Sequence, residues 1–252
     1  MSNAAETKDL GYSPGGKFRI EALNLHVPAG AIYGFLGPNG SGKTTTLRLL
    51  LGLLRPRSGS ITVLGHAMPA ASAEVLARVG YVPEAPHFDG TRSIRDLLRF
   101  QAAFYPTWDW AAAEALLKQF DLDAARPFGR LSKGQRAKVL MLSAMAQRPE
   151  LLVLDEPTDG LDPVARRDIM DIIEQGGHGI DKRCFSSACL AGMVTVKYGD
   201  RPHDRGWNAL LVRLGYRQLV KTVWWSGTAH RIWAKKEMTA DEVRSVLGSP
   251  NT

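Results

Sequence analysis

The chain has 252 residues, of which 44% are hydrophobic and 23% are charged, and its formal net charge is +7. This length allows one large domain or two small ones, and the apolar share is enough for a sizeable core. No run of about 18 apolar residues occurs, so we expect no membrane-spanning helix. The first ten residues lack the apolar stretch of a signal peptide, so we expect a cytoplasmic protein. Two cysteines, Cys184 and Cys189, are too few for a disulfide framework and lack the spacing of a metal site.

The positive charge is concentrated at one end of the chain. Residues 1–176 carry 20 Lys and Arg against 19 Asp and Glu, a net charge of +1, whereas residues 177–252 carry 12 against 6, a net charge of +6. The second segment also holds both cysteines and four of the six tryptophans. A basic excess confined to one segment does not indicate nucleic-acid binding by the whole protein. We place a boundary near residue 176.

Short apolar segments alternate with helical ones along the first part of the chain. Apolar runs bounded by turn residues predict strands over four ranges: 17–30, 31–36, 59–65 and 79–83. Helices are predicted over residues 45–51 and 71–79.

A longer helical region follows. From Thr91 to Phe128 the apolar residues recur with a helical period in two amphipathic segments. Residues 106–109 separate these segments, and Thr107 or Asp109 is the expected N-cap of the second. We interpret residues 91–148 as a helical subdomain, with ordinary core helices as the alternative; a further helix is predicted from Arg136 to Arg148.

A phosphate-loop motif lies between a predicted strand and a predicted helix. Residues 37–45 read G-P-N-G-S-G-K-T-T and fit the pattern G-x-x-x-x-G-K-[ST]. The glycines let successive N–H groups point inward, and the helix N-terminus adds its positive end. Lys43 is then expected to reach the β- and γ-phosphates of a nucleotide, and the Thr44 hydroxyl to ligate Mg²⁺. A glycine-rich turn with a chance lysine is the alternative.

Two carboxylates follow an apolar run further along the chain. Residues 151–154 are all apolar, as expected of a parallel strand covered on both faces, and Asp155 and Glu156 come next. Ligands bind at the carboxyl ends of strands in open α/β sheets. Asp155 is therefore a candidate Mg²⁺ ligand, and Glu156 a candidate to orient or deprotonate an attacking water. The alternative is a solvated turn.

The segment Leu131-Ser132-Lys133-Gly134-Gln135 completes a familiar order of motifs. With residues 37–44 and 151–162, it makes the chain resemble the nucleotide-binding subunit of ATP-binding cassette (ABC) transporters over roughly residues 10–175. The segment differs from the usual L-S-G-G-Q only at Lys133. The short layout and residues 104–109 are most similar to exporters of the ABC-2 type. The resemblance implies an α/β P-loop NTPase fold with a mostly parallel sheet, N-terminal antiparallel strands and a helical subdomain, in a core of residues 1–176.

In such proteins two cassettes pair head to tail, and each ATP lies between the phosphate loop of one and the L-S-G-G-Q segment of the other. Residue by residue, the resemblance assigns ATP binding to Gly37, Pro38, Asn39, Gly40, Ser41, Gly42, Lys43, Thr44, Thr45, Ser132, Gly134 and Gln135. It assigns Mg²⁺ binding to Thr44, Glu84 and Asp155, and catalysis to Glu156. Upstream, Tyr12 is a candidate to stack on the adenine ring, with a surface tyrosine in a Gly/Pro-rich loop as the alternative.

The resemblance also implies partners. We expect an ATPase that powers a separate membrane-spanning permease, pairs with a second, identical or different cassette, and sits on the inner face of the cell membrane. No nucleic-acid partner is expected. The alternative from another class is a soluble ABC ATPase that acts on ribosomes or nucleic acid, for which the basic segment 177–252 is the only support.

Two positions depart from the family pattern. Glu84 stands where a glutamine usually contacts Mg²⁺, and a carboxylate can fill that role. The family also has a switch histidine about 32 residues after the catalytic glutamate, in a stretch like F-S-S-H. Here Phe185-Ser186-Ser187 precedes Ala188, 32 residues after Glu156, and the nearest histidines, His178 and His203, do not fit this spacing. A cassette that binds ATP but hydrolyses it poorly is therefore a further alternative.

Residues 177–252 do not continue the family pattern. Permissible codons for residues 199–212, read one base along, can spell A-I-D-R-M-I-A-G-G-T-L-F-W, which resembles the family's closing segment. The same offset lets residues 185–187 spell S-H-L, which restores a histidine. We hypothesise a reading-frame shift after about residue 176. The alternatives are a divergent basic regulatory segment or an interfacial membrane contact through Trp224 and Trp225, for which no long amphipathic helix is predicted.

Overall fold

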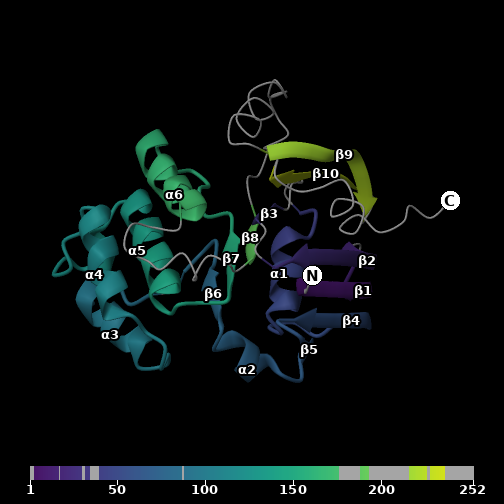
Figure 1. Ribbon diagram of the computed structural model, residues 1–252, viewed down its shortest axis with the longest axis horizontal. Helices are drawn as coiled ribbons and strands as arrows, with labels where there is room; N and C mark the ends of the chain where they lie inside the picture. The colour runs from purple at the N-terminus through teal and green to yellow at the C-terminus, as the bar shows by residue number, and fades with distance from the viewer. Residues whose placement is uncertain are drawn as a thin grey trace.

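The computed structural model describes residues 3–16, 18–29, 32–34, 40–86, 88–175, 188–192, 216–225 and 228–235. A parallel sheet lies in the middle of the molecule, with a group of helices on one side and an antiparallel sheet on the other (Figure 1). This arrangement confirms the predicted α/β P-loop fold with a mostly parallel sheet, N-terminal antiparallel strands and a helical subdomain.

The antiparallel sheet has the strand order β2-β1-β4-β5. Its strands are β1 (Asn3–Gly15), β2 (Phe18–Pro28), β4 (Ser58–Val63) and β5 (His66–Met68). Buried and exposed residues roughly alternate along β2, as in a sheet with one face on a core. Strands β2 and β4 confirm two predicted strands, whereas the sequence interpretation missed β1 and β5.

The parallel sheet has the strand order β3-β8-β7-β6. Its strands are β3 (Ile32–Gly34), β6 (Val79–Val82), β7 (Leu151–Asp155) and β8 (Ala188–Gly192). All five residues of β7 are buried. Leu152 and Leu154 contribute to one apolar core, and Leu151 and Val153 to a second. The prediction of a strand covered on both faces is therefore confirmed.

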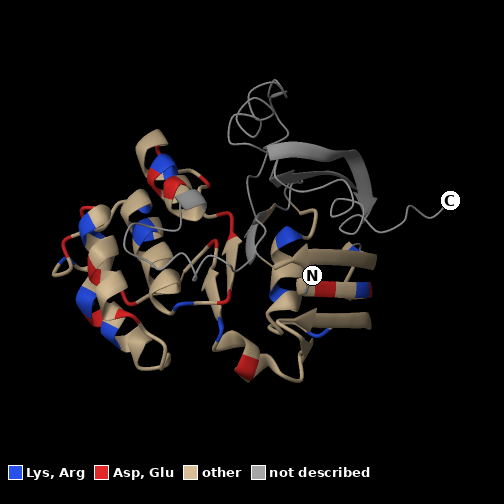
Figure 2. Ribbon diagram, in the orientation of Figure 1, with Lys and Arg blue, Asp and Glu red and all other residues tan. Residues whose placement is uncertain are grey.

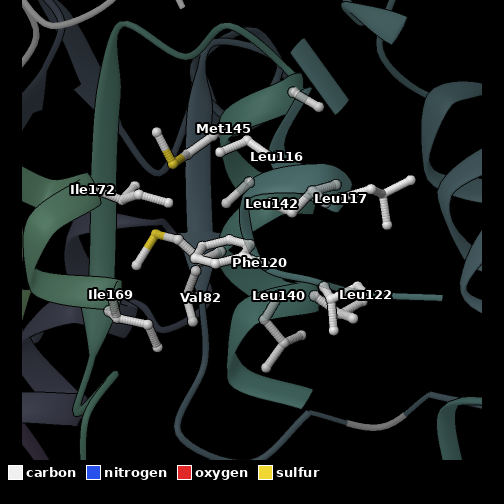
Figure 3. Close-up of a cluster of buried hydrophobic side chains, with 14 of the residues drawn as sticks. Val82, Leu116, Leu117, Phe120, Leu122, Leu140, Leu142, Met145, Ile169 and Ile172 are labelled. Atoms are coloured by element: carbon white, nitrogen blue, oxygen red, sulfur yellow. The ribbon is translucent and has the colours of Figure 1, made fainter. Parts of the chain in front are cut away.

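The first core joins the sheet to four helices: α3 (Ile94–Ala102), α4 (Trp110–Gln119), α5 (Lys133–Ala146) and α6 (Pro163–Gln175). Figure 3 shows Phe120 and Leu142 of the helical group beside Val82 of the sheet and Ile172 of α6. The second core lies between the parallel sheet, the antiparallel sheet and α1 (Lys43–Leu50). A short helix, α2 (Ser72–Leu76), and a 3-10 turn at Phe128–Arg130 complete the helical elements outside these groups in the described ranges.

Capping side chains set two helix starts. The Asp109 carboxylate accepts a hydrogen bond from Ala112 N at 3.0 Å and caps α4, whereas the Thr107 hydroxyl donates to the carbonyl of Gln147. Helix α5 begins three residues before the predicted Arg136. There the Ser132 hydroxyl accepts from Gln135 N, while the Gln135 side chain accepts from Ser132 N. This capping box satisfies donors of the first turn. The helix therefore starts inside residues 131–135, the segment that resembles L-S-G-G-Q and that we call the signature segment.

The remaining described strands, β9 (Tyr216–Trp225) and β10 (Thr228–Lys235), form an antiparallel pair. In the described part of the chain, no helix combines the length and apolar character that crossing a membrane requires. Basic and acidic residues are interspersed over α3 to α6, without a surface of one sign on these helices in this view (Figure 2).

Candidate functional site

The phosphate-loop helix meets the carboxyl end of β7. The Thr44 hydroxyl donates a hydrogen bond of 2.8 Å to Asp155 Oδ1. Lys43 Nζ lies 3.4 Å from Glu156 Oε1, and the two side chains are only 4% and 10% exposed. The structure therefore brings together the two motifs that the sequence analysis predicted to act on one ligand.

Glycines shape the described part of the loop. Gly40 and Gly42 have φ angles of 79° and 96°, in the left-handed region that disfavours side chains. An added Cβ at Gly42 would also lie 3.1 Å from the ring of Phe18 on β2. This backbone leads directly into α1, whose N-terminus carries Lys43 and Thr44. Gly37, Pro38 and Asn39 lie outside the described residues.

Two buried oxygen atoms at this site lack a hydrogen-bond partner among the described residues: Asp155 Oδ2 and Ser41 Oγ. Burial raises the pKa of Asp155, while the hydrogen bond from Thr44 opposes the shift and the nearby charges of Glu84 and Glu156 add to it. A buried carboxylate that is short of a positive partner fits a cation. The donor set of Thr44 and Asp155 oxygens is the hard-oxygen type that Mg²⁺ prefers.

Glu156 occupies an unusual backbone conformation. Its φ angle is 52°, which is uncommon for a residue with a side chain. The Glu156 carbonyl accepts a hydrogen bond of 3.1 Å from Asp159 N, which closes the turn that follows β7. Strained backbone of this kind persists where the surrounding structure holds it, and it concentrates at functional sites.

Glu84, the third proposed metal ligand, follows β6, the neighbour of β7, and is exposed. Its charge contributes to the raised pKa values of Asp155 and Tyr81. Desolvation is the main cause of the Tyr81 shift, and Arg48 opposes it. The structure therefore places Glu84 near enough to act electrostatically on the proposed metal site.

The predicted signature residues form a second site in the same chain. Ser132, Gly134 and Gln135 line a pocket of about 270 Å³. Its other walls come from α5 and the start of α6: Lys138, Asp162, Val164 and Ala165. None of the described phosphate-loop residues, 40–45, lines this pocket, so these loop residues and the residues at the start of α5 occupy separate places in one chain.

Asp162 was not among the predicted site residues. Its carboxylate accepts hydrogen bonds from the backbone N–H groups of Val164 and Ala165, and it caps α6. Hydrogen bonds from these two N–H groups also lower its pKa. The sequence carries the signal, because an Asp directly before Pro163 is a typical helix start.

The structure gives Tyr12 and Ala188 surroundings that differ from those expected from the sequence. Tyr12 is partly buried in β1, opposite Ile20, and not in a loop. Ala188, which the residue count placed at the switch-histidine position, pairs with Leu151 at the amino end of the parallel sheet. The residue of β8 opposite Asp155 is Gly192.

The fold and the paired motifs define a P-loop nucleotide-binding protein. A family model described as "ABC transporter" matches residues 20–159, more than half of the chain. The chain belongs to the ABC transporter family, whose ATP-binding proteins it resembles throughout the phosphate-loop core.

Individual relatives agree with this assignment. The chain is 37% identical over 175 residues to the bacitracin transport ATP-binding protein BcrA of Bacillus licheniformis, an alignment that covers 69% of this chain and 57% of that protein. It is 39% identical over 158 residues to the Nod factor export ATP-binding protein I of Burkholderia lata, covering 60% and 52%. The chain thus spans little more than half the length of these curated relatives.

Solved structures share the fold. The ATP-binding subunit of an ABC transporter superposes with a TM-score of 0.68 at 23% identity, covering 99% of this chain and 95% of the other. A dimeric ATP-binding cassette bound to ADP and phosphate, described as a post-hydrolysis state, gives a TM-score of 0.63 at 20% identity, covering 74% and 87%. These similarities establish the fold and are too low in identity to transfer residue roles.

Proposed function

We propose that this chain is the ATP-hydrolysing subunit that powers an ABC exporter of the ABC-2 type. Two cassettes pair head to tail, bind two ATP molecules between them and separate after hydrolysis. The cycle drives a separate membrane-spanning permease on whose inner, cytoplasmic face the cassettes sit. The export function named for the Nod factor relative supports the direction of transport.

One observation carries the proposal: Lys43 and Thr44 of the phosphate loop contact Glu156 and Asp155 at the end of β7. In the proposed reaction Lys43 binds the β- and γ-phosphates, together with the backbone N–H groups of the loop. Glu156 orients and deprotonates the attacking water. Buried carboxylates beside a lysine that can bind phosphate suit phosphoryl transfer to water better than a purely structural turn.

Thr44 and Asp155 would hold Mg²⁺, with Glu84 as a third ligand. The ion would supply positive charge that neutralises the phosphate oxygens during transfer. The unpartnered Asp155 Oδ2 supports this role.

The signature pocket supports the need for a second copy. Ser132, Gly134 and Gln135 lie at the start of α5, where backbone N–H groups and a helix N-terminus favour an anion. Because none of the described phosphate-loop residues, 40–45, lines this pocket, we infer that one chain supplies one half of each proposed site. The second cassette supplies the other half, as head-to-tail pairing requires.

Glu156→Gln tests the proposal. The amide keeps the size of the side chain but cannot take a proton from water, so we expect phosphate release to fall by a factor of about 100 or more. We expect the variant to retain MgATP and to accumulate as a dimer in sedimentation velocity. If ATP leaves the variant monomeric, or if phosphate release is unchanged, the proposed role of Glu156 is wrong.

A cassette with impaired hydrolysis is the second candidate. Neither Ala188, placed by the count, nor Gly192, placed by the sheet, can supply a switch histidine, and the sequence has no histidine between residues 179 and 202. Phosphate release by the purified wild-type chain, alone and with its permease, distinguishes the two. Turnover in the typical range of about 1 s⁻¹ or faster would contradict impairment.

We further propose that residues after about 176 are translated from a shifted reading frame. The family model ends at residue 159, and the BcrA alignment spans 175 of the 252 residues. The jump to a net charge of +6 after residue 176 agrees with this. The nucleotide sequence of the gene is the test. Codons for residues 199–212 that cannot be shifted to A-I-D-R-M-I-A-G-G-T-L-F-W would contradict the proposal and leave a divergent basic segment.

A further inference from the structure

Lys133 is the one residue of the signature segment that departs from the family pattern, and the structure gives its side chain a defined place. It is the first residue of α5, directly after the capping residue Ser132. Its neighbours Ser132 and Gly134 line the signature pocket. The lysine side chain is 64% exposed, so its ammonium group is accessible beside that pocket.

Lys133 lies over the turn that follows β7. Its Nζ is 3.6 Å from Asp159 Oδ2. Gly160, the next residue, has a φ angle of 60°, and a Cβ built there would be 2.5 Å from Lys133 Nζ. The lysine therefore occupies the space that a side chain at position 160 would need. The φ angle of 60° by itself favours glycine at position 160.

The pair of Lys133 and Asp159 can exchange partners easily. Both side chains are well exposed, at 64% and 49%, and exposed ion pairs contribute little net stability because water competes for both charges. A phosphate group carries more negative charge than one carboxylate and has several acceptor oxygens, so it is the stronger partner for an ammonium group. The N-terminal end of α5 favours the same anion.

We propose that Lys133 is a γ-phosphate contact that changes partners during the cycle. In the structure it pairs with Asp159. When two cassettes pair, it moves to the γ-phosphate of the ATP held by the other copy's phosphate loop. This inference rests on the proposed function, because a second copy must bring that phosphate to the signature pocket.

The exchange has a consequence inside the protomer. Asp159 N donates the hydrogen bond to the Glu156 carbonyl that closes the turn after β7. When Lys133 leaves Asp159, the turn that begins at Glu156 loses an electrostatic tie to α5. Occupancy of one ATP site is in this way linked to the loop that carries the catalytic base of the other site.

The test measures ATP-driven dimerisation of the full chain in a Glu156→Gln background by sedimentation velocity. Lys133→Ala removes the proposed phosphate contact at both sites. We expect it to raise the ATP concentration at half-maximal dimerisation by about tenfold, roughly threefold for each of two contacts. Asp159→Asn releases Lys133 from its competing partner. We therefore expect the ATP concentration at half-maximal dimerisation not to rise but to fall, by up to about threefold.

The opposite directions separate exchange from a structural role. If Lys133 and Asp159 only hold the fold together, both variants weaken dimerisation alike, and that result overturns the proposal. Lys118→Ala on α4 is the matched control, because it removes one exposed lysine that does not line the signature pocket. A Lys133→Ala effect no larger than that of Lys118→Ala would also overturn the proposal.

A last measurement separates this inference from the proposed function. If the Glu156→Gln parent does not dimerise with ATP, the proposed function itself is wrong. If the parent dimerises and Lys133→Ala dimerises equally well, only the role of Lys133 is wrong. ADP lacks a γ-phosphate, so ADP affinity should be the same in the parent and in Lys133→Ala; a loss there would contradict a specific γ-phosphate contact.

Discussion

Lys43 and Glu156 are each other's partner: Nζ lies 3.4 Å from Oε1, and both side chains are almost completely buried. The cation proposed to bind phosphate and the carboxylate proposed to activate water are thus paired in the structure. In the proposed mechanism, nucleotide binding draws Lys43 toward the phosphates and frees Glu156. The affinity for nucleotide therefore includes the cost of separating this pair.

The first prediction concerns ADP. Glu156→Gln replaces the ion pair by a weaker contact, so Lys43 becomes more available to phosphate. We expect ADP without Mg²⁺ to bind the monomeric variant about three to ten times more tightly than the wild type. Isothermal titration calorimetry measures this directly.

Its control is Glu84→Gln, which removes a carboxylate whose charge also acts on Asp155 but which forms no ion pair with Lys43 among the described contacts. We expect a smaller gain in ADP affinity for this variant. Equal gains in both variants would mean that general charge repulsion, and not the Lys43 pair, sets the affinity.

The second prediction concerns Thr44. Its hydroxyl donates to Asp155 Oδ1 at 2.8 Å. The oxygen of this hydroxyl group is also a proposed Mg²⁺ ligand. Thr44→Val keeps the shape and removes the oxygen. We expect the gain in ATP affinity produced by Mg²⁺ to fall by about tenfold, while binding without Mg²⁺ changes by less than about twofold. A full Mg²⁺ effect in the variant, measured by titration with and without the ion, would exclude Thr44 as a ligand.

The third prediction concerns the contact between α5 and α6. A Cβ at Gly134 would lie 2.7 Å from Ala165 Cβ, closer than such atoms approach. Gly134→Ala should therefore lower the free energy of unfolding by about 1 kcal/mol, since overpacking of about 1–3 kcal/mol exceeds the gain in helix propensity. Urea unfolding provides the measurement.

Ala165→Gly restores the missing space. In a double-mutant cycle we expect Gly134→Ala and Ala165→Gly to show a favourable coupling of about 1 kcal/mol. Additive effects of the two substitutions would show that the clash is relieved elsewhere and that the two helix starts are not in firm contact.

The fourth prediction is a pH dependence. Arg78 makes two hydrogen bonds, of 2.6 and 2.7 Å, to the Glu150 carboxylate, and these lower the pKa of Glu150 below its usual 4.5. A carboxyl group whose pKa is lower in the folded state stabilises the fold at pH values above its pKa in the unfolded state. This stability is lost as the pH falls through its pKa in the folded state. Because the Arg78–Glu150 pair is partly exposed, we expect it to contribute about 0.5–1 kcal/mol to the free energy of unfolding.

Glu150→Gln should therefore be less stable than the wild type by that amount at about pH 7, and the difference should shrink as the pH falls below 4.5 and vanish once Glu150 is protonated in the folded protein. Urea unfolding at a series of pH values measures both limits. A difference that stays constant over this range would show that Glu150 acts through packing and not through its charge.

The sequence determined the kind of protein and the main elements of the core. The pattern G-x-x-x-x-G-K-[ST] and the apolar run before Asp155 are local signals, because backbone conformation and strand burial depend on residues near one another in the chain. The same holds for β7, which was predicted correctly, and for the cap of α4, for which Asp109 was one of two candidates. β1 was missed because its alternation of buried residues is irregular, with several register shifts against β2.

Only the tertiary structure decided which groups meet. The contacts of Lys43 with Glu156, of Thr44 with Asp155 and of Lys133 with Asp159 join residues that are distant in sequence. The strand register likewise placed Ala188 opposite Leu151. Such pairings depend on how sheets and helices pack against one another. Residue spacing alone does not give this packing, because the lengths of the connecting segments vary.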